Sequence, residues 1–298
     1  MIAVGGGSAI VTARAATILL AEKRDVRALC TRREPDGRLV SPRLRAPKLP
    51  LWIVPTTPTT AYAKAGSAVR DPATGERLAL YDPKTRAQGV VLDPGVALTA
   101  PASLALSSGL NAFAMAVEGL QADEDDPLAE ALLTHALRML AEWLPRLQAE
   151  PDDAEPRLRL MLAALLCGQG SDFVGGGLAQ ALSHAAGPRS STANGVVEAL
   201  LLPYTMRFNA PVTGARMARI ADALQDPAGP GERTPDGAIA AVERVLAEVK
   251  VPARLRDVGV VGESLSEIVD HTLDDWAVTR IPRAAGRDEL TELVHAAW

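Results

Sequence analysis

From Pro101 to the C-terminus, the chain is a succession of long segments rich in alanine and leucine, and this stretch constrains the fold most strongly. Within each segment the apolar residues recur at helical spacing, and clusters of proline and glycine separate one segment from the next. Aromatic residues are only 3% of the chain, so the core between these helices must consist mostly of alanine, leucine and valine. The helices are predicted at residues 102–121, 127–149, 155–171, 174–186, 194–208, 214–224, 236–248, 263–274 and 287–297.

The first hundred residues have a different pattern, which indicates an α/β domain. Ile2–Val4 is a short apolar strand that leads through glycines into a helical pattern at about residues 9–23. Further strands are predicted at Leu51–Val54 and at Gly89–Leu92, with a β-hairpin over residues 67–92 whose turn is Asp71–Gly75. We therefore expect two domains, an α/β domain at residues 1–100 and an all-helical domain at residues 101–298.

The turn between the first strand and the first helix carries the residues Gly5, Gly6, Gly7 and Ser8. Glycines let backbone N–H groups approach an anion closely, and the amino end of a helix favours negative charge. A tight strand-to-helix turn also needs glycine for steric reasons. This motif alone is therefore compatible with phosphate binding and equally with a purely structural turn.

Charge and the scarcity of metal-binding side chains exclude several classes of protein. The formal net charge is −5, which argues against a general nucleic-acid binder. Two cysteines and four histidines cannot form a disulfide framework or a cysteine-rich zinc site. The chain shows neither a signal peptide nor an apolar run of about 18 residues, so we expect a cytoplasmic protein with no membrane partner.

Six stretches, taken in order, resemble the iron-containing alcohol dehydrogenase family, which shares its fold with the dehydroquinate synthases. Within the family the chain is most similar to the maleylacetate reductases, through Gly109–Ala114, Leu166–Gly168 and the tail from Arg280 to Trp298. The resemblance covers essentially the whole chain. The six stretches are Ala3–Ser8, Ile53–Thr57, Leu92–Pro94, Ser108–Glu118, Gly177–Gly187 and Asn194–Asn209.

The resemblance implies a dehydroquinate synthase-like fold, with an N-terminal α/β dinucleotide-binding domain, an all-α C-terminal domain and the active site between them. It implies NAD or NADP as the cofactor, with the pyrophosphate at the glycine turn. Thr56, Thr57 and Thr60 would line the ribose region, or else satisfy backbone groups of their own turn. The basic run Arg32–Arg45 is open to two interpretations, a contact to the 2′-phosphate of NADP or a solvated loop.

The family holds a divalent metal with one aspartate and three histidines, and this chain departs from that pattern at each position. Asn111 and Met115 stand where the family has the aspartate and the first histidine, four residues apart on one helix. Gln180 and Asn194 stand where it has the other two histidines. Neutral amides and a thioether are poor ligands for Fe²⁺ or Zn²⁺, so we expect no metal.

The remaining polar residues are expected to form a neutral cleft. His184 matches a family histidine beside the nicotinamide and is the expected proton donor; a packing role is the alternative. Asn111, Gln180 and Asn194 are expected to orient the substrate. Substrate contacts are expected at Met115, Tyr62 and Arg280. The alternative for Tyr62 is that it only fills the cleft. By resemblance of the tail, Asp275, Trp276 and Arg283 are further candidates.

Family members carry another βαβ-rich segment before the glycine turn. Either that segment lies upstream of this sequence, or the chain lacks it and leaves a sheet edge that a second copy or a partner would cover. A homodimer is the expected assembly.

These inferences predict a metal-independent, NAD(P)H-dependent reductase that acts on a small carbonyl compound or activated alkene, including an acidic one. The alternative is a repurposed non-redox or inactive homologue that works as a partner subunit.

Overall fold

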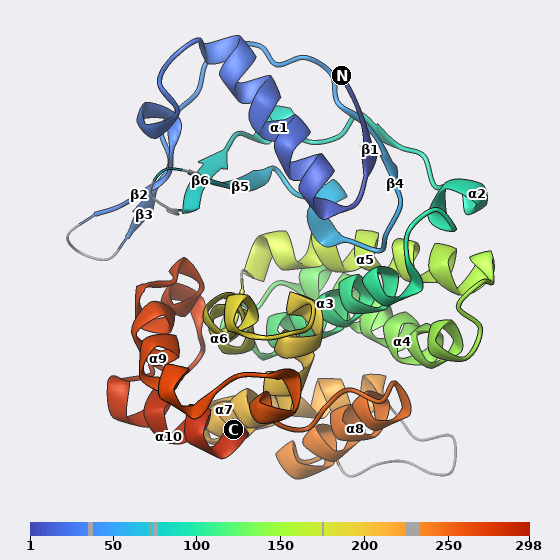
Figure 1. The fold of residues 1–298 in the computed structure, drawn as a ribbon, viewed down its shortest axis with the longest axis vertical. Coiled ribbons are helices and arrows are strands. Elements are labelled where there is room, and N and C mark those ends of the chain that lie inside the picture. Colours follow the sequence, from blue (N-terminus) through green and yellow to red (C-terminus); the bar gives the residue numbers. More distant parts are fainter. Residues whose placement is uncertain (35–37, 72, 74–76, 175, 225–232) are drawn as a thin grey trace.

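The computed structural model describes residues 1–34, 38–71, 73, 77–174, 176–224 and 233–298. All strands of the described residues lie before Val91, and the long helices that follow form a separate layer beneath them (Figure 1). The strands are β1 (Ile2–Gly5), β2 (Arg32–Arg33), β3 (Leu39–Val40), β4 (Trp52–Pro55), β5 (Gly66–Arg70), β6 (Arg77–Tyr81) and β7 (Gly89–Val90). The helices are α1 (Gly7–Glu22), α2 (Pro94–Ala97), α3 (Ala102–Gln121), α4 (Pro127–Ala149), α5 (Ala154–Val174), α6 (Leu178–Ala186), α7 (Asn194–Ala223), α8 (Pro235–Glu248), α9 (Leu265–Asp274) and α10 (Arg287–Ala297).

A small parallel sheet, in the order β1-β4-β7, begins the chain. Ala3 lies opposite Ile53 in the register, and both side chains are buried on the face covered by α1. The side chains that alternate with them point the other way: Ile2 is 70% exposed, Val4 60% and Trp52 49%. One face of the sheet is therefore apolar and open to solvent, and β1 forms its edge.

Buried charges hold the α/β part together. Lys48 Nζ lies 2.7 Å from Glu22 Oε1 at the end of α1 and 2.9 Å from Asp82 Oδ2, which follows β6. The Lys48 side chain is fully buried, and its two partners are nearly so. The β5–β6 hairpin is antiparallel, as expected, while most of its predicted turn at residues 71–75 lies outside the described residues.

The helical layer follows the predicted segments closely, with one correction. Residues 194–208 and 214–224 are not two helices but one, because α7 runs unbroken through Pro203 and Pro211. Each proline removes one backbone hydrogen bond. The helix continues because its buried side packs along α3, α6 and α8, and this packing outweighs the local preference to stop.

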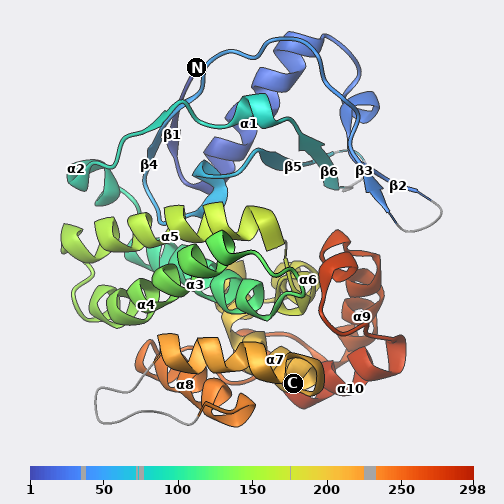
Figure 2. The same ribbon diagram turned by 180° about the vertical axis from the view of Figure 1, so that it is seen from behind.

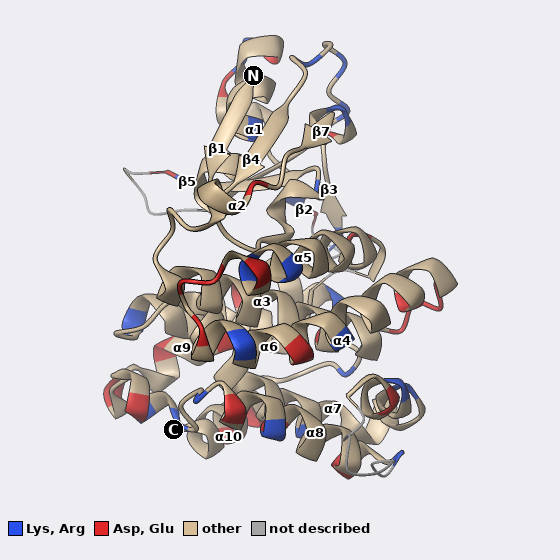
Figure 3. Cartoon of the chain, turned by 90° about the vertical axis from the view of Figure 1, so that its right-hand side faces the viewer, with Lys and Arg blue, Asp and Glu red and all other residues tan. Residues whose placement is uncertain are grey.

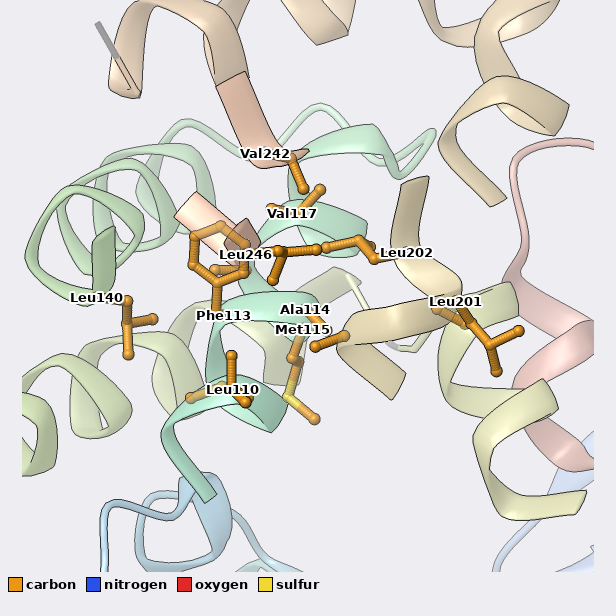
Figure 4. Close-up of a cluster of buried hydrophobic side chains, with 14 of the residues drawn as sticks. Leu110, Phe113, Ala114, Met115, Val117, Leu140, Leu201, Leu202, Val242 and Leu246 are labelled. Carbon is orange, nitrogen blue, oxygen red and sulfur yellow. The ribbon is translucent and has the colours of Figure 1, made fainter. Parts of the chain in front are cut away.

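The core lies mainly between α3, α4, α5 and α7, and it is made of small and branched aliphatic side chains around a single phenylalanine, Phe113. In Figure 4, Met115 points away from Phe113 and Val117. Seen from behind, α5 again lies directly under the α/β part (Figure 2). Blue and red residues are interspersed over the helices in Figure 3. No helix among the described residues has the length and apolarity to cross a membrane.

Candidate functional site

A pocket lies where the β5 strand of the α/β part faces the ends of two helices. The strand contributes its carboxyl-terminal half, α6 contributes its last turn and α7 its first residue. The cavity measures about 340 Å³. It is lined by Ala68, Val69, Arg70, His184, Gly187, Pro188 and Asn194.

His184 lines this pocket, and a second residue, Asp275, holds its imidazole ring in place. Its Nδ1 lies 2.9 Å from Oδ2 of Asp275, and its side chain is 17% exposed. Asp275 is fixed in turn, because its Oδ1 accepts the backbone N–H of Ala277 at 2.8 Å. A carboxylate at Nδ1 favours the tautomer with the proton on that nitrogen and leaves Nε2 for proton exchange with a ligand.

A cluster of buried polar side chains lies between α3, α6 and α7. Asn111 Nδ2 donates to Glu198 Oε2, which joins α3 to α7. Glu118 sits two turns further along α3 and caps α6, because its carboxylate accepts the backbone N–H groups of Ala179 at 2.6 Å and Gln180 at 3.3 Å. Burial raises the pKa of Glu118 to about 7. Burial, and then the neighbouring Glu118, raise the pKa of Glu198 well above its usual range.

Gly195 sets the distance between these helices. A Cβ at this position would lie 1.9 Å from the backbone oxygen of Ser107, so only glycine allows α7 to cross α3 this closely. The close crossing lets Asn111 reach Glu198.

Lys64 reaches the same region from the turn before β5. Its Nζ lies 3.2 Å from Sδ of Met115, one helical turn from Asn111. Burial lowers the pKa of the Lys64 ammonium, and Cys167, Asp172 and Glu198 partly oppose this effect. The thioether thus faces a cation of the protein itself.

Asn111, Met115, Gln180 and Asn194 stand at the positions of the family's metal ligands, but their side chains are poorly suited to bind a metal ion. Asn194 Nδ2 donates to Ser183 Oγ at 3.2 Å, and the Gln180 side-chain oxygen is buried without a hydrogen-bond partner. No three His, Cys, Asp or Glu side chains of the described residues come together as metal ligands. Three neutral amides and a thioether beside an ammonium are a poor ligand set for a divalent cation.

The glycine turn does fit a dinucleotide pyrophosphate. Gly5 has φ +140°, and Cβ atoms at Gly6 and Gly7 would lie 3.1 and 3.2 Å from the hydroxyl oxygens of Thr57 and Thr59. No side chain caps the amino end of α1, and no acidic residue lies in its first turn, so N–H groups near Ser8 remain for an anion.

The three threonines expected at the ribose follow β4 and differ in exposure. Thr57 is 1% exposed and Thr60 5%, so both side chains have little surface left for a ribose and instead pack within the turn. Thr56 is partly exposed, and its N–H donates to Gly5 O at 3.1 Å.

The expected substrate contacts also change. Tyr62 is 1% exposed and donates its hydroxyl to Met161 O, so it fills the core instead of touching a substrate. Arg280 is exposed and does not line the pocket beside His184. Arg283 lies in another hollow, where it contacts Glu289 and the Phe208 ring. Met115 faces Lys64.

The structure therefore brings together His184, Asp275 and Asn194 at the pocket, with Asn111 and Gln180 in the buried cluster behind. Sequence reasoning missed Lys64, Glu198 and Arg70. Glu198 follows Asn194 by four residues on one helix, which was a usable signal. A single lysine in an alanine-rich turn gives none.

Comparisons with known proteins identify the family and the fold. Residues 1–94 match the family model described as iron-containing alcohol dehydrogenase, and residues 105–298 match the C-terminal model of the Fe-containing alcohol dehydrogenase family. Lactaldehyde reductase of Escherichia coli strain K12 is 32% identical over 304 residues, covering 100% of this chain and 76% of that protein. Maleylacetate reductase 2 of Cupriavidus pinatubonensis is 31% identical over 217 residues, covering 73% of this chain and 58% of that protein.

Solved structures share the fold. 1,3-Propanediol oxidoreductase superposes with a TM-score of 0.90 at 23% identity, covering 100% of this chain and 76% of that one. Sulfoacetaldehyde reductase from Bifidobacterium kashiwanohense, solved in complex with NAD+, superposes with a TM-score of 0.81 at 20% identity, covering 99% of this chain and 75% of that one. The expected dehydroquinate synthase-like fold is confirmed.

Proposed function

Because the chain belongs to the iron-containing alcohol dehydrogenase family, we propose that it is an NAD(P)H-dependent reductase that works without a divalent metal on a small carbonyl compound. The observation that carries the proposal is the His184–Asp275 pair at the edge of the pocket, 2.9 Å between Nδ1 and Oδ2. Relatives named lactaldehyde reductase and maleylacetate reductase support the reaction class.

A bound reduced nicotinamide supplies the hydride to the carbonyl carbon. The protein then has to protonate the oxygen that gains the electron pair. His184 Nε2 is the donor in this proposal, and the Asp275 carboxylate stabilises the charged imidazolium before transfer. Asn194, which also lines the pocket, offers an amide group to orient the substrate.

The cofactor would rest with its pyrophosphate on Gly5, Gly6, Gly7 and Ser8. The uncapped amino end of α1 supports this placement, because its free N–H groups and helix dipole favour a phosphate. Binding of NADH against NADPH distinguishes the two cofactors.

Metal independence rests on the donor set. The ammonium of Lys64 lies 3.2 Å from the sulfur of Met115, and electrostatic repulsion would oppose a divalent cation at that position. The amides of Asn111, Gln180 and Asn194 carry no charge, and neutral amide oxygens are poor ligands for Fe²⁺ or Zn²⁺.

An acidic substrate is the preferred class because Arg70 is among the residues that line the pocket with His184. Arginine is well suited to pair with a carboxylate. The carboxylate end of a keto acid or an aldehyde acid would then face β5, with its carbonyl toward α6.

The test combines cofactor binding with turnover on chelator-treated protein. NADH or NADPH is expected to change fluorescence on binding, and a panel of aldehydes, keto acids and unsaturated keto acids is screened for cofactor oxidation. Replacing His184→Gln is expected to lower turnover by about 10²–10⁴-fold with binding intact. The exposed His135→Gln serves as the matched control.

Each outcome of the test supports or refutes a part of the proposal. If neither reduced cofactor binds, the chain is not a reductase, and the alternative of an inactive or non-redox homologue takes its place. Activity that disappears with chelator and returns with Fe²⁺ or Zn²⁺ refutes metal independence alone.

A further inference from the structure

The Lys64 ammonium has more N–H donors than hydrogen-bond partners among the described residues. A lysine carries three N–H donors, yet within the described part of the chain the hydrogen-bond partner of Lys64 Nζ is the Met115 sulfur alone, at 3.2 Å. A thioether is a weak acceptor. Placing an ammonium partly inside a protein with so poor a partner costs stability, and such a cost is typical of a group kept for a ligand.

The turn that carries Lys64 is held from several directions. Arg14, itself fully buried, donates to Ala61 O and, at 2.7 Å, to Gly66 O. Arg86 donates to Ala63 O at 2.8 Å. These bonds hold the backbone on both sides of Lys64 and fix the starting point of its side chain.

Helix α5 supports the turn from below. A Cβ on Gly168 would lie 2.7 Å from Thr60 O and 2.8 Å from the Ala63 side chain, so the helix backbone touches the turn directly. A charge on a backbone fixed in this way is preorganised, which is the condition under which charge stabilises a developing anion best.

Lys64 lies outside the pocket lining, and a chain of contacts runs from it toward the pocket. Met115 and Asn111 share one face of α3, Asn111 donates to Glu198, and Glu198 lies one turn from the pocket residue Asn194 on α7. Along the chain, a single residue, Ala65, separates Lys64 from the pocket strand β5.

We propose that the Lys64 ammonium is the resident cation of this site: it takes the place of the metal in the iron-containing relatives, excludes a divalent ion from the Asn111–Met115 face and donates a hydrogen bond to the carbonyl oxygen of the substrate. The second half of this inference rests on the proposed reductase function. The first half does not.

The first experiment reads metal binding and needs no activity. The substitutions Asn111→Asp, Met115→His, Gln180→His and Asn194→His restore the family ligand set, once with Lys64 kept and once with Lys64→Met. Cobalt(II) titration, followed by its visible absorption bands, is expected to show stoichiometric binding only in the variant without Lys64. Equal affinity in the two folded variants, whether tight or absent, overturns the proposal.

The second experiment reads stability. Lys64→Met alone removes the poorly partnered charge and is expected to leave the urea midpoint unchanged or raise it, with Lys250→Met, at an exposed position, as the control. A clear fall of the Lys64→Met midpoint below the control identifies Lys64 as a structural residue and overturns the proposal. This measurement decides if the ligand-restored variants fail to fold.

The third experiment reads catalysis. Lys64→Ala is expected to keep NADH binding, to lose at least about 10²-fold in turnover, and to regain part of it when ethylammonium is added. Full activity without Lys64 overturns the catalytic half. An inactive wild-type protein overturns the proposed function instead, and leaves the cobalt and stability results to decide whether Lys64 is the resident cation.

Discussion

Replacing Lys48→Met tests whether buried charge holds the α/β part together. The ammonium is fully buried between Glu22 at 2.7 Å and Asp82 at 2.9 Å. Methionine keeps most of the side-chain volume and removes the charge. Glu22 would then lose its lysine partner, and Asp82 would keep only the partly exposed Lys84.

Lys84→Met provides the matched control on the same carboxylate. Lys84 Nζ also lies 2.9 Å from Asp82, but its side chain is 42% exposed. Removing one partner of a buried ion pair costs about 3–5 kcal/mol. An exposed pair contributes about 0–1 kcal/mol. We therefore expect Lys48→Met to lose at least about 2 kcal/mol more than Lys84→Met in the free energy of unfolding at pH 7.

The pH dependence of the stability provides an independent test of the same ion pairs. A hydrogen bond from Lys48 lowers the pKa of Glu22. Burial would raise the pKa of Asp82, but hydrogen bonds from Lys84 and Lys48 outweigh it and lower that pKa too. Carboxyl groups with lowered pKa stabilise the fold above their unfolded pKa of about 4, and this stabilisation disappears as the pH falls through the lower folded values. The difference between wild type and Lys48→Met should therefore shrink below about pH 4.

Urea unfolding followed by circular dichroism at pH 7 and at acidic pH measures both effects. A cost at pH 7 no greater than that of Lys84→Met would refute the reasoning, as would a cost that stays constant into acid.

Three further outcomes are expected. Gly168→Ala should destabilise the protein, because overpacking costs about 1–3 kcal/mol and the gain in helix propensity returns at most about 1 kcal/mol. Gly214→Ala should stabilise the protein by up to about 1 kcal/mol in thermal unfolding, because its Cβ would meet Pro235 at an ordinary 3.7 Å. Because burial raises the pKa of Glu118 to about 7, the unfolded state releases that proton first, so stability should fall between about pH 4.5 and 7, and Glu118→Gln should flatten this limb of the urea-midpoint profile. Light scattering after gel filtration should show a dimer that Ile2→Lys and Val4→Lys dissociate, because both side chains lie on the open apolar sheet face; a wild-type monomer at every concentration would exclude it.

Most of the fold could be predicted from the sequence because its signals are local. Helix α3 and helix α4 begin and end at the predicted residues, since the apolar period and the flanking Pro101 and Asp126 mark them. α7 could not be predicted whole, because Pro211 signals a stop in the sequence and only packing against α3 and α8 overrides it.

The candidate site shows the same division. His184 and Asn194 were expected in one cleft from family motifs, and they do share a pocket. Tyr62 was expected at the cleft because the sequence carries bulk there, but it points into the core toward Met161, which only the long-range packing of α5 decides. The contact between Lys64 and Met115 joins residues 51 apart, and no periodicity records it.

Asp275 also joins the two layers of the molecule. Its backbone oxygen accepts a hydrogen bond at 3.1 Å from Arg33 of β2, a residue 242 positions away in the other layer, while its carboxylate holds His184. A separation of the two layers at this point would have to break the bond to Arg33. The residue that orients the imidazole in the helical layer is therefore the same residue that ties this layer to β2.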